Sequence, residues 1–243
     1  MTAVFAHRGW TEEAPENTVA AFVAARRLGA DGVELDVRSG AGGALVVHHD
    51  AILADGRPVA AVGPPDLPPD VPLLAAALEA CAPMAVNVEI KNVPGEPGFD
   101  PERGIAARVV RAVAATGWPE RVVVSSFDPG VLDAVVAADP DLAVGWLLGR
   151  VADPPDVAAE ARRRRYRALH PHVSGVDAAL VAAAHGAGLG VAVWTVNEPG
   201  DLAAMAALGV DAVITDRLAA ALAARPGPGG TGPAANGGPA GPS

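Results

Sequence analysis

The sequence predicts a single α/β domain folded as a (β/α)8 TIM barrel. Eight short runs rich in Val, Ile and Ala alternate along the chain with eight longer, alanine-rich stretches. A strand followed by a helix is the repeating unit of a parallel sheet, and 243 residues are close to the usual size of one barrel. Eight such units in a chain of this length favour a closed barrel over an open, doubly wound sheet.

Hydrophobic patterning places the elements in order. Strands are expected at residues 4–6, 33–37, 86–90, 122–125, 143–147, 168–170, 191–194 and 212–215. Helices are expected at residues 18–28, 73–80, 105–116, 129–138, 157–165, 178–187, 199–208 and 218–224. Gly29 and Gly188 follow expected helices, where a left-handed cap is favourable, and Glu198 or Asp201 can serve an early helical turn.

Three segments fall outside this repeating pattern. After a glycine-rich turn at 40–43, residues 44–48 predict a short strand that returns along the second barrel strand. Residues 55–72 are rich in proline and predict a loop. Residues 226–243 consist mainly of Gly, Pro, Ala and Ser and have no charged side chain, which predicts a disordered tail. The barrel domain is therefore expected to span residues 1–225.

Composition and charge exclude several functional classes. The net charge of −10 argues against nucleic acid as a partner, because such binding needs a basic surface. Cys81 is the only cysteine, so no intramolecular disulfide is expected, and an apolar helical context places it in the core. The sequence shows neither a signal-peptide pattern nor an apolar segment long enough for a membrane span, so we expect a cytoplasmic protein without integral membrane association.

Acidic side chains gather where a parallel barrel carries its functional groups, at the C-terminal ends of strands. Glu34 and Asp36 are two residues apart on the second strand and point to one face, and Glu89 ends the next strand. Burying such neighbouring anions is unfavourable unless a cation offsets them. Oxygen ligands without cysteine favour one hard divalent ion, Mg²⁺ or Ca²⁺, with Mn²⁺ as a further candidate. The alternative is a set of structural salt bridges to Arg8, Arg38 and Lys91.

Two histidines are expected beside these carboxylates. His7 follows the first strand and His49 follows the return strand, and two imidazoles can act as general base and general acid near neutral pH. His48 is the weaker candidate, because an extended strand turns it opposite to His49. His170 either lines the rim or ends a strand, and His185 is expected to be an exposed helical residue.

Two cations and two aromatic residues complete the expected rim. Arg8 brings a fixed positive charge next to His7. Lys91 is the one lysine among 18 basic residues, and its compact ammonium suits a phosphate oxygen, although it can equally be a partner for Glu89. Phe127 and Trp194 end strands and are expected either to form an apolar wall for a glycerol or alcohol group or to cap the core.

Short motifs appear in a fixed order at these strand ends. They are His7-Arg8-Gly9, Pro15-Glu16-Asn17-Thr18, Glu34-Leu35-Asp36-Val37, Val46-Val47-His48-His49-Asp50, Val88-Glu89-Ile90-Lys91 and Val193-Trp194-Thr195-Val196-Asn197. Further fragments are Ser125-Ser126-Phe127 and Val213-Ile214-Thr215-Asp216. Each fragment alone is weak, but in this order over nearly all of residues 3–218 they resemble the glycerophosphodiester phosphodiesterase family.

The resemblance implies a TIM barrel that hydrolyses glycerophosphodiesters, small-molecule substrates, to sn-glycerol 3-phosphate and an alcohol with one divalent cation. By motif, it assigns the metal ligands to Glu34, Asp36 and Glu89 and the acid/base pair to His7 and His49. It assigns phosphate or substrate binding to Arg8 and Lys91, places Asn17 near the metal or substrate, and gives Glu16 a role in supporting the loop. Residues 51–72 are shorter and richer in proline than the family segment that covers the site, so head-group preference stays open.

Three other functions stay open at the level of sequence. A lysophospholipase D with the same metal ligands would need an apolar entry near the rim, for which residues 51–72 offer modest material. A non-catalytic phosphate-ligand binder would keep Arg8 and Lys91 but would have little use for two rim histidines and three carboxylates. A metal-dependent sugar isomerase would not explain the two cations. The sequence specifies no oligomeric state.

Overall fold

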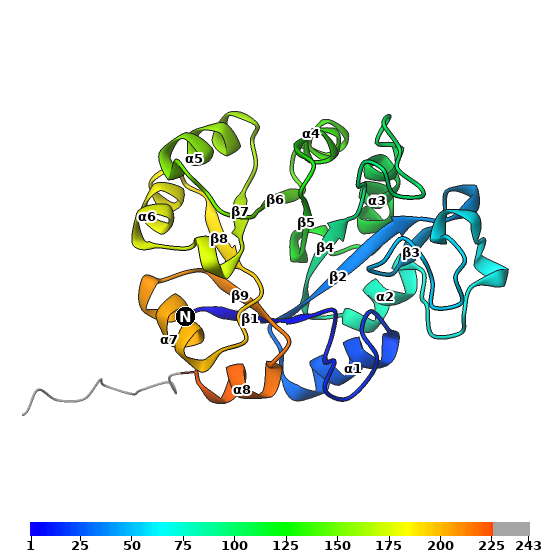
Figure 1. The fold of residues 1–243 in the computed structure, drawn as a ribbon, viewed down its shortest axis with the longest axis horizontal. Coiled ribbons are helices and arrows are strands. Elements are labelled where there is room, and N and C mark those ends of the chain that lie inside the picture. The colour runs from blue at the N-terminus through cyan, green and yellow to red at the C-terminus, as the bar shows by residue number, and fades with distance from the viewer. Residues whose placement is uncertain (226–243) are drawn as a thin grey trace, which may run out of the picture.

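Eight parallel strands close into a barrel with helices around the outside (Figure 1). The strands are β1 (Ala3–His7), β2 (Gly32–Ser39), β3 (Leu45–Val47), β4 (Ala85–Ile90), β5 (Val122–Ser126), β6 (Ala143–Leu148), β7 (Ala168–Pro171), β8 (Gly190–Val193) and β9 (Ala212–Thr215). Their order is β1-β9-β8-β7-β6-β5-β4-β2-β3, and β1 also pairs with β2, which closes the barrel. The predicted (β/α)8 TIM barrel is confirmed. The computed structural model describes residues 1–225, so the tail predicted at 226–243 lies outside the described residues.

Each predicted helix is present, with small differences at its ends. The helices are α1 (Val19–Leu28), α2 (Leu74–Cys81), α3 (Gly104–Ala114), α4 (Pro129–Ala138), α5 (Pro154–Arg163), α6 (Ala178–Gly186), α7 (Pro199–Leu208) and α8 (Leu218–Ala223). Helix α5 begins earlier than predicted because the Asp153 side chain caps it and Pro154 is tolerated in the first turn. Among the described residues, no helix combines the length and apolar character needed to cross a bilayer.

The segment between β3 and α2 is more ordered than the loop predicted for residues 55–72. It contains two short 3-10 turns, Val59–Ala61 and Pro64–Asp66. Leu53, Val59 and Val62 pack with Val46 of β3 in a small hydrophobic cluster separate from the main core. Strand β3 runs antiparallel to β2, as predicted. It contributes Val46 to this cluster. The apolar residues spaced between the prolines explain why the segment folds against the barrel.

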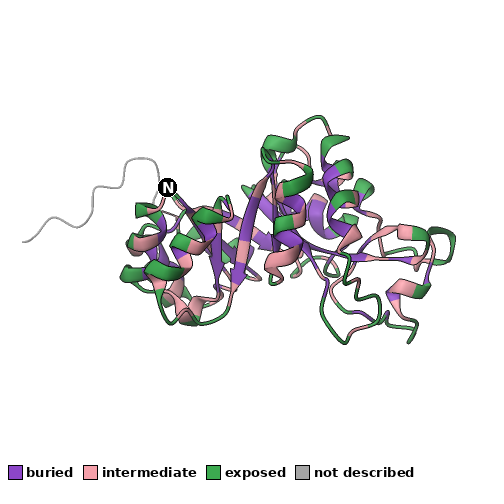
Figure 2. Ribbon diagram, turned by 90° about the horizontal axis from the view of Figure 1, so that it is seen from above, coloured by how far each residue is buried: buried purple, intermediate pink, exposed green. Residues whose placement is uncertain are grey.

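The main core consists largely of Val, Leu and Ala residues. In Figure 2 the strands are coloured mostly as buried, whereas the helices carry both buried and exposed residues. Cys81 is buried in it, as the sequence predicts. Inside the barrel, glycine makes room for rings: a Cβ at Gly32 would lie 2.4 Å from the Phe5 ring, and one at Gly145 would lie 2.3 Å from His170 Nε2. Small residues on some strands thus allow larger side chains from others to fill the barrel interior.

Strand register brings polar residues from several strands to one end of the barrel. His7 at the end of β1 pairs with Glu34 of β2. Further along β2, Asp36 pairs with Glu89 of β4. Because neighbouring parallel strands end at the same rim, the side chains of these residues converge there.

Candidate functional site

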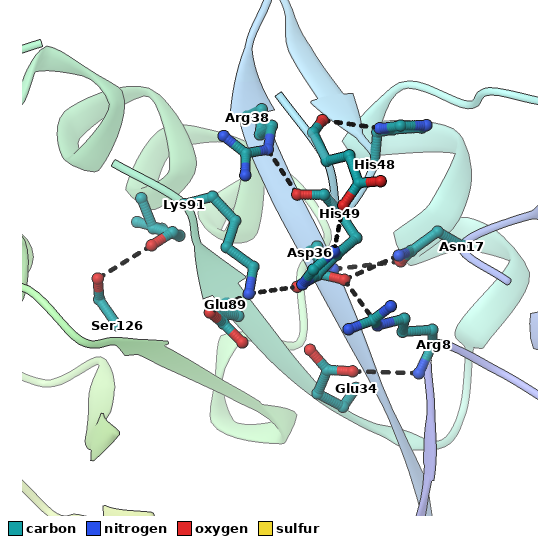
Figure 3. Close-up of polar contacts among 12 residues, drawn as sticks. Arg8, Asn17, Glu34, Asp36, Arg38, His48, His49, Glu89, Lys91 and Ser126 are labelled. Carbon is teal, nitrogen blue, oxygen red and sulfur yellow. Dashed lines mark hydrogen bonds and ion pairs between the residues drawn. The ribbon is translucent and has the colours of Figure 1, made fainter. Parts of the chain in front are cut away.

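Three carboxylates from the neighbouring strands β2 and β4 come together (Figure 3). Glu34, Asp36 and Glu89 each offer an oxygen, and these atoms lie within 4.8 Å of one another. The three residues are buried, with exposed fractions of 3%, 0% and 8%. The structure therefore brings together the three residues that the sequence singled out as metal ligands.

Two cations, Arg8 and Lys91, contact this cluster, but they do not reach every carboxylate oxygen in it. Arg8 Nε lies 3.3 Å from Asp36 Oδ2. Lys91 Nζ lies 3.1 Å from Asp36 Oδ1 and 2.5 Å from Glu89 Oε1. Glu34 Oε2 accepts the backbone N–H of Arg8 at 3.1 Å, whereas Glu34 Oε1 accepts no hydrogen bond from any described residue. The unmatched carboxylate charge and the free oxygen fit a divalent cation held by the three acids.

The environment of each carboxylate agrees with this interpretation. Burial, reinforced by the neighbouring charge of Asp36, raises the pKa of Glu34 to about 8. Burial likewise raises the pKa of Glu89. Burial acts in the same direction on Asp36, but Lys91 and Arg8 outweigh it and hold the pKa of Asp36 below its ordinary value. Glu34 thus needs either a proton or a further cation, and a divalent ion supplies the latter.

Arg38 does not join these ion pairs, so the alternative of three structural salt bridges was wrong for this residue. Its Nη1 lies 2.7 Å from Glu96 Oε2, and its Nε donates to the backbone oxygen of His49 at 2.7 Å. The loop after β4 supplies Glu96, which gives the guanidinium a carboxylate away from the cluster. Arg38 instead ties the backbone at His49 to β2.

His7 is held in place by Asp216. The two side chains lie 2.7 Å apart, between His7 Nδ1 and Asp216 Oδ1, while His7 Nε2 lies 3.8 Å from Glu34 Oε2. A carboxylate accepts hydrogen bonds, so Nδ1 carries the proton and Nε2 faces the carboxylate cluster. Burial lowers the pKa of His7, but the hydrogen bond to Asp216 and the charge of Glu34 outweigh burial, and the pKa is raised overall.

His49 lies beside Asp36, whereas His48 turns to the other side (Figure 3). His49 Nδ1 is 2.7 Å from Asp50 Oδ1, and its side chain is 34% exposed. Burial, together with the charges of Lys91 and Arg8, lowers the pKa of His49. His48 Nδ1 contacts the backbone oxygen of Asp50 at 2.8 Å. The structure thus brings His49 to the cluster and leaves His48 out, and both residues follow the end of β3 at Val47.

Asn17 and Glu16 support the site from the loop before α1. Asn17 Nδ2 donates to Asp36 Oδ2 at 2.8 Å, and the backbone N–H of Asp36 donates to Asn17 Oδ1 at 3.2 Å. Glu16 accepts from Arg8 Nη1 at 3.0 and 3.1 Å. Arg8 and Asn17 both have left-handed backbone angles, with φ of 56° and 58°. Such strained conformations outside glycine are typical of functional sites.

Phe127 and Trp194 meet above the end of the barrel. Their rings form an edge-to-face contact with centroids 5.5 Å apart. Phe127 is 49% exposed, so it does not cap the core. The Trp194 ring also contacts His172 edge-to-face at 4.9 Å, and its Nε1 donates to the backbone oxygen of His170. The two aromatic rings therefore lie together at the rim.

Two positioning contacts were not predicted from the sequence. Asp216 lies in one of the motifs, but the sequence does not show that it contacts His7. The two residues belong to opposite ends of the chain, His7 at the end of β1 and Asp216 directly after β9. Asn197 fixes Asp216 in turn: its Nδ2 donates to Asp216 Oδ2 at 2.8 Å, and it accepts the backbone N–H of Asp216 at 2.9 Å. The available signal was the position of Asp216, one residue after β9 at the same rim as the other acids.

Comparison with known sequences gives matches over most of the chain. The family model of the glycerophosphoryl diester phosphodiesterases matches residues 7–62 and 55–220. A glycerophosphodiester phosphodiesterase from Caldanaerobacter subterraneus subsp. tengcongensis is 32% identical over 236 residues, which cover 88% of this chain and 94% of that protein. An enzyme of the same name from Bacillus altitudinis is 30% identical, covering 89% of this chain and 95% of its own length.

Solved structures give a similar result. An Oleispira antarctica phosphodiesterase, in complex with its product sn-glycerol-3-phosphate, superposes with a TM-score of 0.82 at 26% identity, covering 92% of this chain and 96% of its own. A glycerophosphodiester phosphodiesterase from Thermotoga maritima has a TM-score of 0.79 at 25% identity, with coverage of 93% and 99%. The similarity thus extends over the whole barrel.

Proposed function

The chain belongs to the glycerophosphoryl diester phosphodiesterase family, and on that premise we propose that it hydrolyses glycerophosphodiesters to sn-glycerol 3-phosphate and an alcohol. One water is consumed: the bond between phosphorus and the alcohol oxygen breaks, the phosphorus gains a hydroxyl group and the alcohol gains a proton. The product bound by the Oleispira antarctica relative is consistent with this reaction. In this proposal residues 1–225 form one catalytic domain.

One observation carries the proposal. Three buried carboxylate oxygens lie within 4.8 Å of one another, and one of these residues, Glu34, retains an oxygen without a hydrogen-bond donor among the described residues. Around them stand two imidazoles and two fixed cations. A phosphate binder needs the cations alone, and a sugar isomerase has no need of them, whereas cleavage of a phosphodiester uses all of these groups.

Glu34, Asp36 and Glu89 are proposed to hold the metal ion. Their all-oxygen donor set suits Mg²⁺ or Ca²⁺, with Mn²⁺ as a further candidate. When bound, such an ion polarises the phosphoryl oxygens and offsets the negative charge that develops on them. Arg8 and Lys91 contact the same carboxylates and are proposed to bind phosphate oxygens beside the ion. Asn17 orients Asp36 and Glu16 orients Arg8, so these two residues act through their neighbours.

His7 and His49 are proposed as the acid/base pair. His7 Nε2 lies 3.8 Å from Glu34 Oε2, and His49 lies beside Asp36 (Figure 3). One imidazole takes a proton from the nucleophile, and the other gives a proton to the leaving alkoxide. Such help is worth about 10² to 10⁴ in rate. Phe127 and Trp194 are proposed to form the apolar wall against the substrate.

The test is release of glycerol 3-phosphate from glycerophosphocholine, with EDTA followed by addition of Mg²⁺, Ca²⁺ or Mn²⁺. We expect activity to disappear with EDTA and to return with at least one ion. His7→Ala and His49→Ala are each expected to lower kcat at least 10²-fold, because each removes a proton-transfer group. The control is His185→Ala, since His185 lies on α6 in an exposed ion pair with Asp211. Near-normal turnover by both rim variants, with intact circular dichroism spectra, would refute the assignment.

A further inference from the structure

Large apolar side chains are exposed mainly at one place on the described surface. Among residues 1–225, six large hydrophobic residues are exposed, and four of them line one cavity. The four, which we call the apolar rim, are Ile52, Val93, Phe99 and Phe127, with exposed fractions of 41%, 41%, 37% and 49%. They come from the loops after β3, β4 and β5. Exposed apolar residues gathered in a cavity, rather than scattered, indicate a binding surface.

The cavity is continuous with the proposed catalytic centre. It has a volume of about 940 Å³, and its lining includes His49, Glu89 and Lys91 as well as the apolar rim. A ligand whose phosphate lies at the carboxylate cluster can therefore extend along the rim without leaving the cavity. The volume is near the upper end of the range for ligand pockets, and it exceeds what glycerol and a phosphate group alone require.

Beyond the carboxylate cluster, the charged side chains of the cavity are Asp50, which contacts His49, and two ion pairs. Arg38 Nη1 contacts Glu96 Oε2 at 2.7 Å. Arg103 Nε contacts Asp128 Oδ2 at 3.0 Å. Since these pairs already match opposite charges, the wall offers an incoming group little net charge and a row of apolar side chains.

We propose that this cavity binds an apolar chain carried by the substrate, so that the preferred substrates are amphiphilic glycerophosphodiesters. The chain can be attached to the alcohol, as in alkyl glycerophosphodiesters, or to the glycerol, as in lysophospholipids. The inference rests on the proposed function and specifies its substrate class. The sequence suggested little apolar material for such an entry because it pointed to residues 51–72, whereas three of the four rim residues lie in other loops.

The experiment measures kcat/KM for a homologous series of monomeric substrates. One series is glycerophosphoethanol, glycerophosphobutanol, glycerophosphohexanol and glycerophosphooctanol. The other is lysophosphatidylcholine with acyl chains of four to eight carbons, all below the concentration at which micelles form. We expect kcat/KM to rise about twofold per methylene in at least one series, less than the about fourfold of full burial, because the rim is partly exposed.

Matched variants assign the effect to the apolar rim. Val93→Ser and Phe99→Ser, singly and together, are expected to flatten the dependence on chain length. Val19→Ser is the control, since Val19 has almost the same exposure as Val93, 40% against 41%, but lies on α1 outside the cavity. This control is expected to keep the wild-type dependence on chain length.

Two results would overturn the inference. One is a kcat/KM that does not depend on chain length in either series. The other is a higher kcat/KM for glycerophosphocholine than for both eight-carbon substrates, glycerophosphooctanol and the eight-carbon acyl lysophosphatidylcholine, which would assign the cavity to a charged head group. Absence of turnover on every substrate with every divalent ion would instead refute the proposed function itself, so the two failures are distinguishable.

Discussion

At the scale of single residues, the contact between Asp216 and His7 decides how one proposed catalytic imidazole is presented. The 2.7 Å hydrogen bond fixes the tautomer of His7 with Nε2 toward the carboxylate cluster. An amide in place of the carboxylate can hold the opposite tautomer. Asp216 therefore acts as a positioning residue, through His7 rather than on the substrate.

Asp216→Asn is accordingly expected to lower kcat by about 10² or more while the fold persists. Asn197 Nδ2 donates to the Oδ2 position, so the amide oxygen of the variant faces Asn197 and its NH2 group faces His7 Nδ1 as a donor. Asp50→Asn is the matched comparison, since Asp50 pairs with His49 but its side chain is 74% exposed. We expect this second change to stay within about tenfold. Steady-state kinetics of both variants, with unfolding midpoints as a measure of folding, provide the check. Equal losses in the two variants would contradict a special role for Asp216.

His170 gives a prediction on pH. Burial lowers the pKa of His170 to about 4, and within residues 1–225 no charged group contributes to the shift. Because the unfolded chain binds a proton near pH 6.5 and the folded protein only near 4, folding stability from this residue is complete above pH 6.5 and declines as the pH falls toward 4. This difference in pKa corresponds to a contribution of about 3 kcal/mol to the free energy of unfolding.

His170→Leu should therefore lose part of the decline in unfolding free energy between pH 6.5 and 4.5. Urea unfolding at several pH values measures it as the difference between variant and wild type, which cancels the contribution of the carboxylates common to both. The same decline in wild type and His170→Leu would show that His170 is protonated equally in both states.

At the scale of elements, Arg38 joins three pieces of the rim. It extends from β2, pairs with Glu96 in the loop after β4 and donates to the backbone oxygen of His49 after β3. Its side chain is 8% exposed, so these contacts are largely shielded from water. The ion pair of Arg38 with Glu96 thus holds one wall of the cavity in place. The hydrogen bond from Arg38 holds the backbone at His49, a proposed catalytic residue.

Arg38→Met is expected to lower kcat about 10- to 100-fold, as is usual when a residue that orients a catalytic group is lost. Glu96→Gln is the matched variant, because it weakens the ion pair but leaves the hydrogen bond to His49 possible. We expect a smaller effect on kcat from this change than from Arg38→Met. Full activity of Arg38→Met would show that the backbone at His49 keeps its place without the guanidinium.

Local pattern explains which elements were predictable from the sequence. Strand and helix positions follow from apolar periodicity within each segment. The convergence of Glu34, Asp36 and Glu89 follows from the two-residue spacing on β2 and from the position of Glu89 on the next parallel strand. The direction of Arg38 was not predictable, because its partner Glu96 lies in a loop without periodicity. The fold of residues 55–72 was missed for the same reason, since prolines hide the spacing of Val59 and Val62.

At the scale of the whole molecule, the carboxylate cluster couples ion binding to folding. The cluster is assembled from β2 and β4 in the folded barrel, so an ion held there stabilises the folded state over the unfolded chain. At about 100 times the dissociation constant, the gain is about 2.7 kcal/mol. For a barrel of this size, this corresponds to an increase in Tm of about 5–10 °C.

Thermal unfolding in EDTA and in excess Mg²⁺ or Ca²⁺ is expected to show this increase. Glu34→Gln should abolish most of it, because the amide keeps the size of the side chain but removes a charged ligand. Glu102→Gln, an exposed acid outside the cluster, serves as the control and should respond to the ion like the wild type. An identical Tm with and without each divalent ion would contradict the metal site.

The barrel itself was predictable because eight alternating units leave few arrangements, whereas contacts across its closure were not. Pattern within a segment carries no information on which residue of a distant strand will face it. The partnership of His7 with Asp216 therefore appeared only in three dimensions.

The closure between β1 and β9 has a consequence for a chain during synthesis. The hydrogen bond that orients His7 joins residues 209 positions apart, and β1 gains its pairing with β9 only after nearly the whole barrel has been made. A nascent chain that stops before Asp216 already contains every proposed metal ligand but lacks the partner of His7. The proposed hydrolysis would thus reach its full rate only once β1 and β9, from the two ends of the barrel, have paired.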